Sequence, residues 1–166
     1  YVLDYIVTQS YNENNKGNTP EKNGKSRDFE MENGKENKTG YRVEQDSIGA
    51  KDIPGDVYYG VQSLRAAENF RITGLNMHPE IINSLAYIKK ASAITNCEKK
   101  KAKAIVQACD EILTGKLHEY FIVDPIQGGA GTSLNMNANE VIANRAIEIL
   151  GGKKGDYSAV NPNDDV

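Results

Sequence analysis

One stretch of the sequence has residue types that suit the binding of an anion, QGGAGTSLNMNANEV at 127–141. Gly131, Thr132 and Ser133 lie where a glycine-rich turn runs into a helix-forming segment. Glycines let the backbone approach a ligand closely, and the free N–H groups that begin a helix carry a partial positive charge. With two hydroxyl donors at the same end, these three residues are predicted to bind a carboxylate without a metal. The alternative is that Thr132 or Ser133 only caps the helix.

A nucleotide phosphate fits this loop less well. A P-loop needs a lysine that reaches the terminal phosphates, and no lysine occurs between Lys116 and Lys153. A dinucleotide-binding fold needs GxGxxG directly after a hydrophobic strand, and the spacing of GGAG differs from that pattern. The carboxylate interpretation is therefore favoured.

The spacing of apolar residues predicts the elements around this loop. Amphipathic patterns indicate helices over 79–96 and 102–113, and a further helix that leaves the glycine loop and ends at Gly151. Residues 58–70 favour a short helix, and residues 41–60 favour a brief strand and turns. The expected buried stripes are Ile81, Ile82, Leu85, Ile88 and Ala91 in the first long helix, and Ala102, Ile105, Val106, Cys109, Ile112 and Leu113 in the second.

Composition narrows the class of protein. Twenty Lys and Arg against 23 Asp and Glu leave a net charge of −3, which gives no overall attraction to nucleic acid or to anionic lipid. The apolar opening YVLDYIV lacks a basic flank and is too short for a signal peptide or a membrane span. Cys97 and Cys109 have no metal-binding spacing. We expect a cytoplasmic protein with reduced thiols that binds neither nucleic acid nor membrane.

The first part of the chain is expected to be a disordered leader, residues 1–40. Residues 11–40 contain few large apolar groups among many Asn, Lys, Glu and Gly, which is too little to offset the entropy of ordering the backbone. Met31 is interpreted as the true start, with the residues before it as upstream read-through. A folded domain is expected over 41–166.

Several segments resemble the aspartate ammonia-lyases, or aspartases, of the fumarase/aspartase superfamily. QGGAGTSLNMNANEVIANRA resembles that family's glycine-loop signature, YRVEQDSIGAKDIPGDVYYGVQSLRAAENF its opening segment, and ACDEIL its second long helix. The resemblance covers about residues 41–166. Class II fumarases are the nearest competitor, but their loop usually reads SGTQ and their opening has Tyr-Trp-Gly, where this chain has AGTS and YYGVQ. The implied fold is mainly α, the N-terminal helical domain of the fumarase/aspartase fold with a small β element.

The resemblance also implies a chemistry. Aspartases reversibly eliminate ammonia from L-aspartate to give fumarate through an aci-carboxylate intermediate. They need no organic cofactor, and whether a divalent cation such as Mg²⁺ activates this protein is left open. They act as homotetramers on small-molecule substrates. Thr132 matches the family threonine that binds substrate near this carboxylate, and Ser133 is its neighbour in the motif.

Further positions carry over less directly. Arg65 matches an arginine near the family's active region. An equally good interpretation is that Arg65 is a charged, solvent-exposed residue on the surface of a helix. Asn161, Asn163 and Asp164 match the start of an NPNDHVN stretch that contributes to a second anion site in fumarase. Asp165 stands where the family commonly has histidine.

The resemblance assigns no catalytic residue within these 166 residues. In this family the base serine and further substrate contacts lie beyond the segment that ends at Val166, and active sites form between subunits of the tetramer. We therefore expect an N-terminal part of a lyase that is inactive alone. Neither His78 nor His118 has an acid partner at a telling spacing, so neither is predicted to be a general base. The alternatives are part of a class II fumarase and a non-catalytic helical interaction domain.

Overall fold

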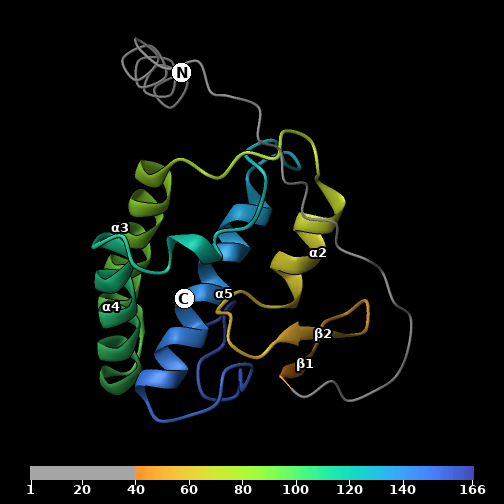
Figure 1. Ribbon diagram of the computed structural model, residues 1–166. Coiled ribbons are helices and arrows are strands. Elements are labelled where there is room, and N and C mark those ends of the chain that lie inside the picture. Colours follow the sequence, from red (N-terminus) through yellow and green to blue (C-terminus); the bar gives the residue numbers. More distant parts are fainter. Residues whose placement is uncertain (1–39) are drawn as a thin grey trace. The chain divides into compact units, whose positions relative to one another are not determined.

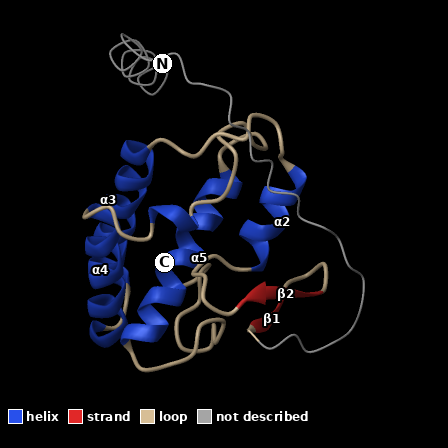
Figure 2. Ribbon diagram, viewed as in Figure 1, coloured by secondary structure: helices blue, strands red, loops and turns tan. Residues whose placement is uncertain are grey.

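The computed structural model describes residues 40–166, which form four α-helices and a two-stranded sheet (Figures 1 and 2). The mainly α fold with a small β element is as predicted; the predicted leader, apart from Gly40, lies outside the described residues. In chain order the elements are β1 Tyr41–Gln45, β2 Ala50–Pro54, α2 Val61–Asn69, α3 Pro79–Asn96, α4 Lys99–Leu113, the 3₁₀ turn His118–Tyr120 and α5 Thr132–Ile149.

The two strands form an antiparallel hairpin in which Tyr41 is opposite Pro54 and Gln45 is opposite Ala50. Its turn is closed by Asp46, whose Oδ1 accepts hydrogen bonds from the backbone N–H groups of Ile48 at 2.9 Å and Gly49 at 3.1 Å. Gly49 has φ 142°, which favours glycine at this position. The predicted brief strand and turns are thus a complete hairpin.

The helix predictions agree closely with the structure. α3 has the predicted bounds, with Pro79 in its first turn and His78 as its N-cap, whose Nδ1 accepts from the N–H of Glu80 at 3.2 Å. α4 begins at Lys99, three residues earlier than predicted, and Gly115 follows its end with φ 85°. The helix predicted over 58–70 covers only Val61–Asn69.

α5 lies at the centre of the described part and contacts α2, α3 and α4 (Figure 1). Val141, Ile142 and Ile147 on α5 are completely buried, and so are Ile105, Cys109 and Ile112 on α4. Full burial of an aliphatic side chain of this size stabilises the fold by about 1.5–3 kcal/mol. Cys109 is therefore a packed apolar group, and burial raises the pKa of its thiol to about 12.

The stripe predicted on α3 is only partly correct. Ile82 is buried, but Ile88 is 59% exposed and Ala91 is exposed, while Ala86 and Ala93 are buried. Isoleucine, leucine and alanine occur around most of this helix, so several stripes fit its sequence equally well. The structure places the face with the two small alanines in the core, where α3 packs against α4.

The first turn of α2 is bound by two carboxylates from distant parts of the chain. Glu140 on α5, completely buried, accepts from the backbone N–H groups of Gly60 and Gln62 at 2.9 Å and of Ser63 at 3.0 Å, and from the Ser63 hydroxyl. Glu44 on β1 accepts from the N–H of Val61 at 2.9 Å. Every amide that α-helix geometry leaves without a partner at this end therefore has one.

Further side chains hold these two carboxylates in place. Arg42 pairs with Glu44 at 2.8 Å and donates to the carbonyl oxygens of Pro54, Val57 and Tyr59. The Tyr157 hydroxyl donates to Glu44 at 3.0 Å. Burial raises the pKa of Tyr157 well above its usual range, so the hydroxyl remains a donor. The hairpin, α2, α5 and the segment after α5 thus meet at one polar cluster.

The cluster leaves no room for a side chain at Gly60. A Cβ there would lie 2.6 Å from Glu44 Oε2 and 2.7 Å from Glu140 Cδ, and closer still to the Tyr157 oxygen. We expect Gly60→Ala to lower the free energy of unfolding by about 2 kcal/mol or more, since overpacking of this kind typically costs about 1–3 kcal/mol. Chemical denaturation of the chain would measure it. Gly115→Ala, whose Cβ meets nothing within 4 Å, measures for comparison the cost of a residue other than glycine at φ 85° without a clash. A Gly60→Ala variant as stable as the wild type would contradict the steric argument.

Candidate functional site

The predicted anion site lies at the start of α5. Gly131 is the N-cap residue, with φ 77° in the left-handed region, and no side chain caps the helix from that position. The alternative in which Thr132 or Ser133 serves as the N-cap is therefore wrong. Thr132 is the first helical residue and is exposed; Ser133 is half-buried.

Two backbone amides at this end have no partner within residues 40–166. The N–H of Leu134 donates to the side-chain oxygen of Gln127 at 2.6 Å, and the N–H of Asn135 begins the helical pattern by donating to Gly131. The amides of Thr132 and Ser133 have no acceptor in this part of the chain. A cavity of about 490 Å³ lies beside Thr132 and is lined by Ile81, Leu85, Ala130, Gly131, Thr132, Leu134 and Asn135. This end of the helix can therefore accept a small anion.

Asp124 anchors the segment that leads into the glycine loop. It is 6% exposed and accepts from the backbone N–H groups of Thr73 at 2.7 Å, Gly74 at 2.9 Å and Ile126 at 2.8 Å, and from the Thr73 hydroxyl. Burial alone would raise the pKa of this carboxyl, but the backbone hydrogen bonds outweigh it and hold the pKa at about 2. Asp124 thus joins the loop after α2 to the loop before α5.

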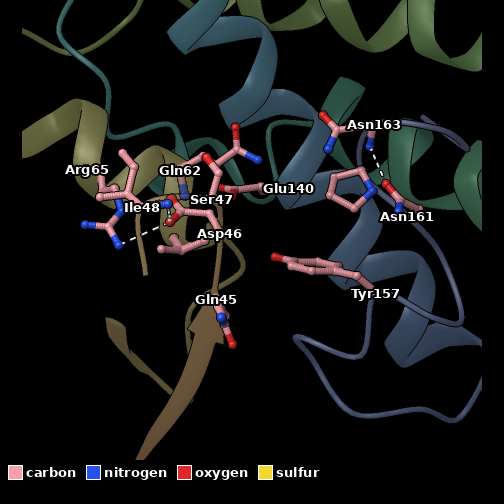
Figure 3. Close-up of a pocket in the computed structure, with 12 residues that line it drawn as sticks. Gln45, Asp46, Ser47, Ile48, Gln62, Arg65, Glu140, Tyr157, Asn161 and Asn163 are labelled. Atoms are coloured by element: carbon pink, nitrogen blue, oxygen red, sulfur yellow. Dashed lines mark hydrogen bonds and ion pairs between the residues drawn. The ribbon is translucent and has the colours of Figure 1, made fainter. Parts of the chain in front are cut away.

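A second cavity, of about 590 Å³, contains three of the other predicted residues (Figure 3). Arg65, Asn161 and Asn163 line it together with the hairpin turn, Gln62, Glu140 and Tyr157. Asp164 is exposed and does not line this cavity. Glu140 also lies eight residues after Thr132 on α5, which corresponds to roughly 12 Å of helix. The structure therefore separates the predicted residues into two places.

Arg65 is not the solvated helix charge that was one of its two interpretations. Its guanidinium binds both carboxylate oxygens of Asp46, at 2.9 Å and 3.2 Å (Figure 3). It also donates to the carbonyl oxygen of Gly49 at 2.9 Å. Burial would raise the pKa of Asp46, but hydrogen bonds from Arg65 and from the turn amides lower it below its ordinary value. Arg65 therefore fastens α2 to the hairpin turn.

The segment from Asn161 to Asp165 folds back on itself. The side-chain oxygen of Asn161 accepts from the N–H groups of Asn163 at 2.8 Å and Asp164 at 3.3 Å. Asp165 accepts from the N–H of Asn161 at 2.8 Å and pairs with Lys101 on α4 at 2.8 Å. Its charge is thus neutralised within the fold.

Sequence patterns gave no signal for several residues of these sites. Gln127, Asp124 and Glu140 act through partners that are far along the chain or across a loop, so no local motif reveals them. His118 contacts the carbonyl oxygen of Ile112 at 2.9 Å, and His78 caps α3, so neither has a catalytic partner in the described part. Residues 40–166 contain no group of three His, Cys, Asp or Glu side chains that could hold a metal ion. None of the described helices is both long and apolar enough to span a membrane.

Removal of the Asp124 carboxylate should weaken the support of the loop. Because its pKa in the folded chain, about 2, is below the ordinary value of 3.8, its contribution to stability is present above pH 4 and is lost as the pH falls toward 2. We expect Asp124→Asn to lower the melting temperature at pH 7 and to reduce the further loss between pH 4 and pH 2. Thermal denaturation followed by circular dichroism would test this. Asp52→Asn, an exposed strand position, is the control, and an unchanged pH dependence in Asp124→Asn would refute the assignment.

Comparison with known proteins places these features in a family. The family described as Lyase matches residues 49–166. The chain is 63% identical over 128 residues to the aspartate ammonia-lyase of Bacillus subtilis, covering 74% of this chain and 27% of that protein. It is 48% identical over 133 residues to the aspartate ammonia-lyase of Escherichia coli, covering 75% of this chain and 28% of that protein.

Solved structures agree. A fumarate lyase:delta crystallin from Brucella melitensis superimposes with a TM-score of 0.74 at 53% identity, covering 75% of this chain and 29% of that one. The class II fumarase of Schistosoma mansoni superimposes with a TM-score of 0.71 at 38% identity, covering 75% of this chain and 28% of that one. The chain spans less than a third of the length of these relatives. From its sequence match and its fold, the chain belongs to the lyase family, within the fumarase/aspartase superfamily.

Proposed function

We propose that this chain is part of an aspartate ammonia-lyase, which reversibly eliminates ammonia from L-aspartate to give fumarate. The relatives named aspartate ammonia-lyase are up to 63% identical to it, whereas the class II fumarase is 38% identical. The single observation that carries the proposal is the start of α5, where the amides of Thr132 and Ser133 have no partner within residues 40–166 and Thr132 lines a cavity.

The proposed role of this end follows from where charge develops in the reaction. Removal of the Cβ proton of L-aspartate places a second negative charge on the adjacent carboxylate, which becomes an aci-carboxylate. Donors that are already fixed in position bind this dianion more strongly than the substrate, and so they lower the barrier. The amides of Thr132 and Ser133, the Thr132 hydroxyl and the partial positive charge of the helix end are such donors.

The remaining groups of the reaction are expected outside these residues. No described histidine is placed to act as a base, and the chain corresponds to less than a third of its relatives. We infer that the general base and further substrate contacts come from other parts of the polypeptide and from other subunits of a homotetramer, and that residues 41–166 form an N-terminal domain without turnover of its own. No organic cofactor is assigned.

The cavity beside Arg65 suits a second anion site less well. Asp46 already neutralises the guanidinium, and Glu140 adds a carboxylate to the lining. The lining therefore carries no net positive charge. We propose that Gly131, Thr132 and Ser133 contact the substrate. Arg65 instead positions α2, and Asn161, Asn163 and Asp164 shape the turn at 161–165.

The reaction itself distinguishes the two related enzymes. The full-length gene product should consume fumarate when ammonia is supplied, and should leave it unchanged in water alone; ultraviolet absorbance of fumarate follows both. Conversion of fumarate without ammonia would instead identify a class II fumarase. Inactivity under both conditions would support a non-catalytic domain.

Thr132 provides a direct test of the site. In the full-length protein we expect Thr132→Val, which keeps the shape and removes the hydroxyl, to reduce kcat by about a hundredfold to a thousandfold, as loss of one oxyanion-hole donor does. Steady-state kinetics with L-aspartate would measure this. Thr95→Val on an exposed part of α3 is the matched control and should retain activity. A Thr132→Val enzyme with the wild-type kcat would exclude the hydroxyl as a transition-state donor.

A further inference from the structure

Gln127 makes the side-chain contact that closes the glycine loop onto α5. Its side-chain oxygen accepts from the N–H of Leu134 at 2.6 Å, while its side-chain nitrogen donates to the carbonyl oxygen of Asp124 at 3.3 Å. The Gln127 side chain thus joins Asp124, which lies before the glycine loop, to Leu134, the third residue of α5. Between these two points, Gly128, Gly129 and Ala130 are exposed.

Other support for the loop within the described residues is slight. The N–H of Gly131 donates to Gly128 over a long 3.4 Å, and a Cβ at Gly128 would lie 3.2 Å from the ring of Phe70. Gly129 and Gly131 both have positive φ, at 35° and 77°, which glycine allows and does not enforce. Asp124 holds the segment before the loop, and the N–H of Asn135 donates to Gly131 at 3.1 Å, so the two hydrogen bonds of Gln127 are the side-chain contacts that join this segment to the first turn of α5.

The Gln127 side chain that accepts from the Leu134 amide carries no charge, and this matters as much as its position. A helix start commonly receives a carboxylate, from an Asp N-cap or from the Glu of a capping box, which neutralises the partial positive charge of the helix end. Here Gly131 has no side chain to offer, and the acceptor is the neutral amide of Gln127. The nearby carboxylate of Asp124 is occupied by Thr73, Gly74 and Ile126. Within the described residues, no carboxylate therefore accepts a hydrogen bond from the first turn of α5.

We propose that Gln127 is a positioning residue for the anion site: it occupies the third amide of α5 with a neutral acceptor, so that a ligand carboxylate is directed to the amides of Thr132 and Ser133 and meets a helix end that the protein has not neutralised. This inference rests on the proposed function and adds a determinant of selectivity for doubly charged ligands.

The test uses the full-length gene product and two probes, succinate as a dianion and succinamate as the corresponding monoanion. Gln127→Glu keeps the acceptor for Leu134 and adds one negative charge. We expect it to weaken succinate binding roughly tenfold or more, because unit charges a few ångström apart interact at this level even at an effective dielectric constant of about 20. Succinamate binding should weaken less, and high salt should reduce both defects.

Gln127→Ala separates position from charge. It removes the acceptor without adding charge, so it should weaken both probes by similar factors with little dependence on salt. Hydrogen exchange monitored by NMR should show the amide of Leu134 protected in the wild type and in Gln127→Glu, and unprotected in Gln127→Ala. Gln107→Glu on the exposed face of α4 adds the same charge elsewhere and should leave binding unchanged.

The outcomes separate the two proposals. Wild-type succinate affinity in Gln127→Glu, or a defect equal for both probes and insensitive to salt, would overturn the role of Gln127. If the wild type binds succinate but releases no ammonia from L-aspartate, the proposed function fails while the variants still decide the role of Gln127. If the wild type does not bind succinate, both proposals are overturned.

Discussion

The start of α2 is where the described part of the chain is held together. Its four free amides are distributed between Glu140 from α5 and Glu44 from β1, so one short helix end joins elements that are far apart in the sequence. Burial raises the pKa of Glu140, against the effect of the hydrogen bonds that favour its charged form. A buried carboxylate is tolerated only with such partners. Because Gly60 lets both carboxylates approach the backbone, the hairpin and α5 are fixed relative to α2.

The N-terminal ends of α2 and α5 differ in how their free backbone amides are satisfied. At α2 the amides are fully satisfied by negatively charged side chains, and the end is closed. At α5 the acceptor is a neutral glutamine amide, two amides remain without a partner in the described residues, and Thr132 is exposed. The same physical property, an excess of unpaired donors at a helix start, is used for structure in one place and is available for a ligand in the other.

The sequence predicted those features that depend on local pattern. The bounds of α3 and the start of α5 follow from apolar spacing, Pro79 and the glycine loop, which act within a few residues. The stripe predicted on α4 is correct for Ile105, Cys109 and Ile112, whereas Ala102, Val106 and Leu113 are only half-buried. The partners of Arg65, Glu140 and Gln127 depend on contacts across turns or between elements, so no pattern revealed them. The face of α3 was misjudged because its apolar residues surround the helix, and only packing against α4 selects one side.

α5 shows why a polar sequence can form the centre of a fold. Asn137 donates to the carbonyl oxygen of Tyr120 and accepts from the N–H of Ile122, both at 2.9 Å, while Asn144 donates to the carbonyl oxygen of Tyr58 at 2.8 Å and accepts from the N–H of Gly155 at 2.7 Å. Each buried amide side chain thus holds a loop that has no regular hydrogen bonding of its own. These contacts fix the helix along most of its length and leave only its first turn open. The role proposed for the first turn of α5 requires donors that are already fixed in position when charge develops beside them, and a helix held along the rest of its length supports that requirement.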